Sequence, residues 1–261
     1  MEEVKAIASA GNLDLRNDRC AVSLVFAAGT RPRASAIGAL AARSDKFAVS
    51  HDPHKVNEVE EGWVELIANG LTFDLTGLNP EPAQVRPECA HLFGLAASAE
   101  LSAGEPITIM PGPHLASART MFPVLRTLAW LGALLAELPQ VRAVVWHPAR
   151  SWSDPHYFRA SVLRWIEGGA FPGLGLTAIA PTADGGLTSE GLAIFTGQEL
   201  VLAPELARDR AEGAKIALRL INWLAESGGV AESTSVMGPS GETLNLVPDR
   251  EKQNVKVTAS S

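Results

Sequence analysis

Cysteine is scarce in this sequence of 261 residues, which has only Cys20 and Cys89. Two cysteines do not make a disulfide framework, and such a low content favours a reducing compartment. The N-terminus lacks the basic start and apolar run of a secretory signal. The longest apolar stretch, 127–136, is about half as long as the ~20 residues that cross a membrane. These absences predict a cytoplasmic protein without a membrane span.

The motifs of the common enzyme classes are also missing. The chain has no glycine-rich triphosphate loop, no Gly-x-Gly-x-x-Gly turn, no Gly-x-Ser-x-Gly elbow and no His-Glu-x-x-His pair. His51-Asp52-Pro53-His54 has the spacing of a metal-binding pair, but Pro53 disfavours a helix that would align the two histidines. A zinc site also needs three or four ligands. We therefore expect neither a metal nor a cofactor.

Basic residues are outnumbered, because 22 lysines and arginines face 29 acidic residues and the formal net charge is −7. Proteins that bind phosphate backbones usually carry a basic face, so nucleic acid is disfavoured as a partner. The hydrophobic content of 46% and charged content of 20% are those of a globular protein with a substantial core.

Periodicity and turn residues predict an α+β protein with a mostly antiparallel sheet, packed helices and, as an alternative, two related α/β halves. Residues 1–18 are polar and aperiodic, which predicts a flexible segment before a single domain over 19–261. A subdivision of this domain near 100–105 is an alternative. Asn69-Gly70 predicts a tight hairpin turn. We expect helices over 34–42, 120–138 and 206–227, and one that runs from Asp154 or Ser153 to 167. We expect strands over 21–28, 46–50, 63–67, 71–75, 106–110, 141–147, 174–180, 191–195, 199–202, 233–237, 243–246 and, at an edge of the sheet, 255–257.

The segment 141–204 contains the first candidate site. A predicted strand ends in Trp146-His147-Pro148-Ala149-Arg150, and Asp154 and His156 follow at the start of a helix. Ligands often bind where strands end and helices begin, because backbone N–H groups converge there. A histidine at such a point can act as a base, an acid or a ligand near neutral pH.

Two residues outside this cluster are further candidates. Glu199 lies between two predicted strands and would raise the basicity of His147 if the two side chains were paired. His114 follows a predicted strand in the rigid loop Pro111-Gly112-Pro113 and is a candidate ligand-binding residue at the same sheet edge. Each candidate also has a structural interpretation, as an exposed side chain or as the partner of a backbone group.

The second half resembles a known bacterial family. The run 143–146, the segment 191–200 and a later long helix with a glycine-rich hairpin are similar to the family called domain of unknown function 4261. The opening strand and helix, 22–40, fit the start of that family, so the resemblance covers most of the chain. It implies a fold but carries no established activity.

Two functional hypotheses follow. The leading one is a cytoplasmic bacterial protein that binds another protein without catalysis, in an accessory or immunity-type role. The alternative is a hydrolase-like enzyme in which His147 acts as base, Glu199 or Asp154 orients it and Arg150 anchors an anion. Trp146, Arg150, His114 and His156 are the candidate ligand-binding residues. Convergence of His114, His147 and Glu199 on one concave surface would favour the alternative.

Overall fold

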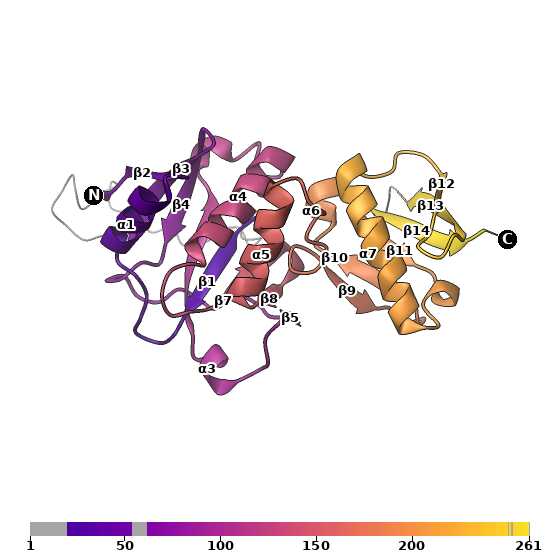
Figure 1. Ribbon diagram of the computed structural model, residues 1–261, viewed down its shortest axis with the longest axis horizontal. Coiled ribbons are helices and arrows are strands. Elements are labelled where there is room, and N and C mark those ends of the chain that lie inside the picture. The colour runs from indigo at the N-terminus through magenta and orange to yellow at the C-terminus, as the bar shows by residue number, and fades with distance from the viewer. Residues whose placement is uncertain (1–19, 54–61, 250, 252, 261) are drawn as a thin grey trace, which may run out of the picture.

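A computed structural model describes residues 20–53, 62–249, 251 and 253–260 of the chain. The segment 1–18 and His54, on which two predictions fell, lie outside the described residues. Within them, two mostly antiparallel sheets carry the helices, which confirms the predicted α+β class and its two halves (Figure 1). No helix in the described part of the chain is both long and apolar enough to cross a membrane.

The first half is an eight-stranded sheet with β1 near its middle. All five residues of β1 are buried, as the continuous apolar run predicts, because helices cover one face of the sheet and a smaller apolar cluster covers the other. The strand order is β2 (Ala48–His51), β3 (Trp63–Ala68), β4 (Leu71–Thr76), β6 (Glu105–Pro111), β1 (Val22–Phe26), β7 (Val141–Trp146), β8 (Ser151–Ser153) and β5 (His91–Phe93).

Helices α4 (Phe122–Leu135) and α5 (Pro155–Ile166) lie side by side over β1 and β7, and α1 (Ala34–Ser44) and α3 (Ala99–Ser102) complete this half (Figure 1). Asp154 caps α5, as predicted, and accepts a hydrogen bond from Tyr157 N at 2.9 Å. In contrast, Met121 and not Thr120 precedes α4, so this helix begins without a side-chain cap. The turn between β3 and β4 has φ of 52° at Asn69 and 75° at Gly70, the positive angles that a primed turn requires.

The second half is a six-stranded sheet with α7 (Arg210–Ser227) on one face. Its strand order is β12 (Thr234–Met237), β13 (Thr243–Asp249), β14 (Asn254–Ala259), β11 (Glu199–Leu202), β10 (Leu187–Glu190) and β9 (Ala178–Pro181). The prediction of an edge strand at 255–257 is wrong, because β14 lies inside the sheet, parallel to β11 and antiparallel to β13. Val255 and Val257 are accordingly buried.

Two further boundaries differ from the predictions. Residues 191–195 do not form a strand, because α6 (Ala193–Thr196) begins there, and β10 forms instead within the predicted loop 181–190. Helix α7 begins only at Arg210, since Asp209 accepts hydrogen bonds from the N–H groups of Ala211 and Glu212 and fixes the helix start.

A row of aromatic rings joins the two halves. Trp146 at the end of β7 stacks on Phe195 of α6, with ring centroids 5.9 Å apart. Phe195 contacts Phe171 edge-on at 5.0 Å, Phe171 contacts Trp165 at 5.4 Å, and Trp165 contacts Phe122 at 5.7 Å. Trp146, Phe171 and Trp165 belong to one apolar cluster that includes residues of both sheets, and Phe195 packs against it, so the halves share a single core.

Candidate functional site

A cleft of about 620 Å³ opens where the turn after β7 faces the turn after β10. The chain reverses after β7 through a short 3-10 turn at His147–Ala149, and Gly191 of the other half packs against that turn. A Cβ atom on Gly191 would lie 2.7 Å from the Cβ of Ala149, and φ of Gly191 is +87°. Only glycine therefore lets the two halves approach this closely. The cleft is lined by Val85, Arg86, Pro87, Glu88, His147, Pro148, Arg150, Glu190, Gly191 and Glu199.

His147 is held by the strands beneath the cleft. Its Nε2 lies 2.8 Å from the Oγ of Ser23 on β1, and that hydroxyl lies 2.8 Å from Oγ1 of Thr108 on β6. This serine–histidine contact has the distance of a nucleophile and its base. However, Ser23 is fully buried in the central strand and its hydroxyl is shared with Thr108. The contact therefore positions the imidazole, and Ser23 does not face a substrate.

Glu199 lines the same cleft, but its carboxylate supports the backbone. Its Oε1 accepts hydrogen bonds from the N–H groups of Gly191 at 2.9 Å and Ala193 at 3.0 Å. Its Oε2 accepts one from Leu192 N at 3.2 Å and another from the hydroxyl of Ser189. Four donors thus converge on one carboxylate and satisfy N–H groups that the start of α6 leaves unpaired. This interaction explains why the segment 191–195 turns into a helix.

Arg150 and Glu190 link the two halves across the cleft. The guanidinium of Arg150 donates to both oxygens of Glu190, from Nε at 2.5 Å and from Nη2 at 3.2 Å, and to Glu88 from Nη1 at 2.5 Å. Nε2 of His91 also lies 2.8 Å from Glu190. Burial raises the pKa of Glu190, but the hydrogen bonds from Arg150 and His91 outweigh it and hold the pKa below its usual value.

Arg150 has an unusual backbone in addition. Its φ of 48° lies in the left-handed region, which costs an ordinary side chain of order 1 kcal/mol or more. This conformation caps the 3-10 turn after β7 and directs the chain back into β8. The ion pair with Glu190 therefore fixes the side chain of Arg150, whose own backbone is strained.

Sequence reasoning missed the part of the cleft rim formed by Arg86 and Glu88. The guanidinium of Arg86 stacks on the ring of Trp152, 4.4 Å from its centroid, and the indole N–H of Trp152 donates to the carbonyl of Glu88 at 3.1 Å. The segment 77–87 contains three prolines and lies between the predicted strands 71–75 and 106–110. No local pattern connects it to β8, since the contact spans more than sixty residues of sequence.

The other predicted site residues lie outside the cleft lining. Trp146 is buried in the aromatic row, Asp154 caps α5, and His156 is exposed on α5. His114 lies in a 3-10 turn after β6, near Asp74, whose pKa is raised above its usual value by burial and by Glu65. Of the three residues whose convergence was in question, His147 and Glu199 come together and His114 does not line the cleft.

The described residues contain no group of three or more histidines, cysteines and carboxylates that could hold a metal ion. Comparisons with family models, with curated proteins and with solved structures give no match for this chain. The resemblance to domain of unknown function 4261 therefore stays a prediction. The function has to be argued from the cleft itself.

Proposed function

We propose that this is a cytoplasmic protein that binds another protein without catalysing a reaction, and that the cleft is its recognition surface. One observation supports this most: the carboxylates that a catalytic histidine would need are held in structural hydrogen bonds. Glu199 accepts four hydrogen bonds at the start of α6, and Asp154 caps α5. A general acid or base must instead reach the reacting proton.

The rim of the cleft has the character of a protein-binding anchor. Arg86 is stacked on Trp152 and so presents its guanidinium at low entropic cost. Arginine is among the residues that most often dominate binding energy at interfaces. Val85 beside it is 94% exposed. We infer that a carboxylate of the partner pairs with Arg86, while an apolar group of the partner covers Val85.

Site-specific photo-crosslinking tests this proposal. A benzoylphenylalanine at Val85 should capture one partner in cells that express the protein at its native level. The same group at Met237, which is 68% exposed on β12, serves as the matched control and should not capture it. The adduct at Val85 should disappear in the Arg86→Glu background. Equal capture at both positions, or capture that survives Arg86→Glu, would refute the proposal.

The hydrolase-like alternative is favoured by one observation, the presence of His147 on the cleft wall with Ser23 at 2.8 Å. In that alternative His147 would act as base on a water molecule, since Ser23 is buried. Substitution of His147 by glutamine separates the two hypotheses. It would abolish turnover by an enzyme, but it should leave capture of a partner by Arg86 and Val85 intact.

A further inference from the structure

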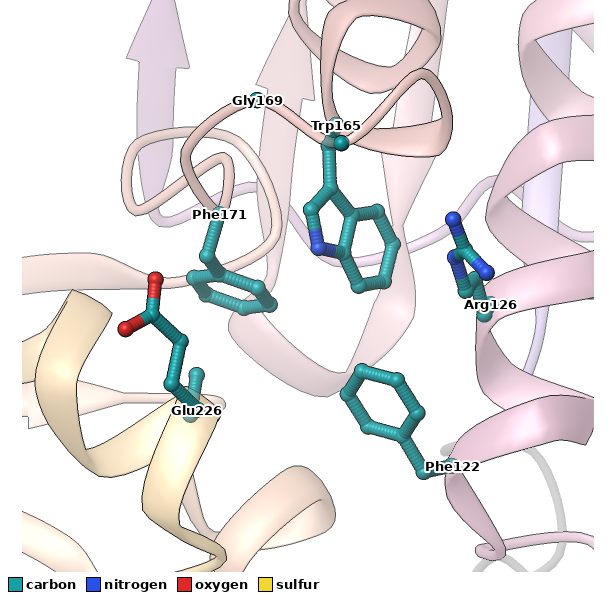
Figure 2. Close-up of a pocket in the computed structure, with 8 residues that line it drawn as sticks. Phe122, Arg126, Trp165, Gly169, Phe171 and Glu226 are labelled. Atoms are coloured by element: carbon teal, nitrogen blue, oxygen red, sulfur yellow. The ribbon is translucent and has the colours of Figure 1, made fainter.

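A second hollow, separate from the cleft, lies where α4 begins and where α5 and α7 end. It has a volume of about 200 Å³, and its walls include three aromatic rings (Figure 2). Trp165 stands edge-to-face with Phe122 on one side and with Phe171 on the other, at interplanar angles of 89° and 87°. Phe122 is 40% exposed, so this ring is accessible from solvent.

Two opposite charges flank the rings. Arg126 lies over Trp165 at 5.7 Å from the ring centroid and donates to the carbonyl of Ile166 at 2.8 Å. Glu226 lies on the side of Phe171, away from Arg126 (Figure 2). Its Oε1 accepts a hydrogen bond from Asn222 at 2.8 Å, and the residue is exposed. The hollow therefore has a carboxylate beside aromatic rings at one end and a cation already bound to a ring at the other.

The surrounding backbone adds negative potential at the end that Glu226 occupies. Helix α7 ends at Ser227 and directs the negative end of its dipole towards this region, whereas the carbonyl of Ile166 at the end of α5 is paired with Arg126. The chain as a whole carries a formal charge of −7, which attracts cations. Gly168 and Gly169 line the hollow without side chains.

We propose that this hollow binds an organic ammonium group of the trimethylammonium type. Such a cation is attracted to the faces of aromatic rings, and a neighbouring carboxylate adds to the attraction. The volume holds a single group of this size and is smaller than the roughly 300–1,000 Å³ of sites for whole drug-sized ligands. Arg126 shows that Trp165 already accepts a cation on one face, so the ligand would lie against Phe122, the exposed ring of the three, on the side of Glu226. This inference does not depend on the proposed function of the cleft.

The test measures binding of choline and of its neutral isostere 3,3-dimethyl-1-butanol. NMR monitors the indole N–H signal of Trp165, and this signal is assigned by its absence in the Trp165→Phe variant. Choline should shift this signal saturably, with a Kd on the order of 1 mM for so small a group. The neutral isostere should bind at least about fivefold more weakly. An N-acetylated trimethyllysine amide provides a second arm: tighter binding than choline would identify the source as a modified polypeptide, and weaker binding a free small molecule.

Four variants of the full chain, one of them a control, test which groups attract and which repel the cation. Phe122→Leu keeps the apolar contact but removes the ring, and should weaken choline binding about fivefold, whereas Phe93→Leu on β5 should not. Glu226→Gln should weaken binding, and Arg126→Gln should strengthen it by removing a like charge. The proposal is overturned if no ammonium compound shifts the Trp165 signal, if the neutral isostere binds equally well, or if Arg126→Gln weakens binding while Glu226→Gln does not.

Discussion

Glu199 provides the sharpest stability prediction, because one carboxylate accepts four hydrogen bonds at the start of α6. In Glu199→Gln the side chain keeps one acceptor oxygen, and its NH₂ group faces N–H groups that are themselves donors. Hydrogen bonds to a charged group contribute about 1.5–3 kcal/mol each, and a buried donor left unpaired costs a similar amount. With one to two bonds lost, the free energy of unfolding should fall by about 3 kcal/mol.

The assay is urea unfolding followed by tryptophan fluorescence, with Glu205→Gln as control. Glu205 is exposed on the short turn before α7, so its substitution should change the free energy of unfolding by less than about 0.5 kcal/mol. A loss of 3 kcal/mol corresponds to a decrease in Tm of roughly 6–12 °C for a chain of this size. If Glu199→Gln matched Glu205→Gln, the carboxylate would not hold α6, and the structural interpretation of Glu199 would be refuted.

Three further predictions concern the contacts around the cleft. In urea unfolding, Trp146→Phe should lower the free energy of unfolding by about 1 kcal/mol less than Trp152→Phe does. The Trp146 indole N–H has no hydrogen-bond partner among the described residues, whereas Trp152→Phe removes a hydrogen bond and a cation–π contact. Equal costs would contradict this prediction. Gly191→Ala should destabilise the fold by several kcal/mol more than Gly197→Ala. Both glycines have positive φ, but only a Cβ atom at position 191 would meet another residue. Similar thermal midpoints of the two variants would contradict the close approach of the halves. Because the folded-state pKa of Glu190 is lowered, its carboxylate should contribute to the free energy of unfolding above pH 4.5, and this contribution should be lost as the pH falls below that value. In chemical unfolding, the stability difference between Glu190→Gln and the parent chain should therefore shrink towards low pH. A difference that grows on acidification would reverse the assigned sign.

Local signals predicted much of the fold. The buried run of β1, the Asn69-Gly70 turn and the Asp154 cap of α5 each depend on residues within a few positions of one another. Such features follow from side-chain burial, positive φ and the unpaired N–H groups of a helix start, all of which act over a few residues. These elements were accordingly placed close to their observed bounds.

The errors arise where a side-chain hydrogen bond or a strand pairing decides, beyond what the local apolar pattern shows. The segment 191–195 has the apolar character of a strand, but the carboxylate of Glu199 pairs with its N–H groups and turns it into α6. The position of β14 depends on its parallel pairing with β11, which lies more than fifty residues earlier. Hydrophobic periodicity carries no information on either interaction, because neither changes the local pattern of apolar residues.

The candidate site was predicted only in part for the same reason. His147, Arg150 and Glu199 were singled out because they follow strands, and they do line one cleft. Glu190, the partner of Arg150, and Arg86, which also lines the cleft, come from the segments 181–190 and 77–87, for which no site was predicted, so the pattern of charges could not be derived before the sheets were placed. The pairing of Arg150 with Glu190 replaces the expected pairing of Glu199 with a catalytic histidine as the main electrostatic feature of the cleft.

The most direct test of the central claim compares the Val85 photo-adduct in two variants of the full chain. Folding of each variant is checked first by circular dichroism and by its thermal midpoint. If the cleft recognises a partner without catalysis, the adduct should form in His147→Gln at the level of the parent chain and should be lost in Arg86→Glu. Retention of the adduct in Arg86→Glu, or its loss in a folded His147→Gln protein, would contradict the account.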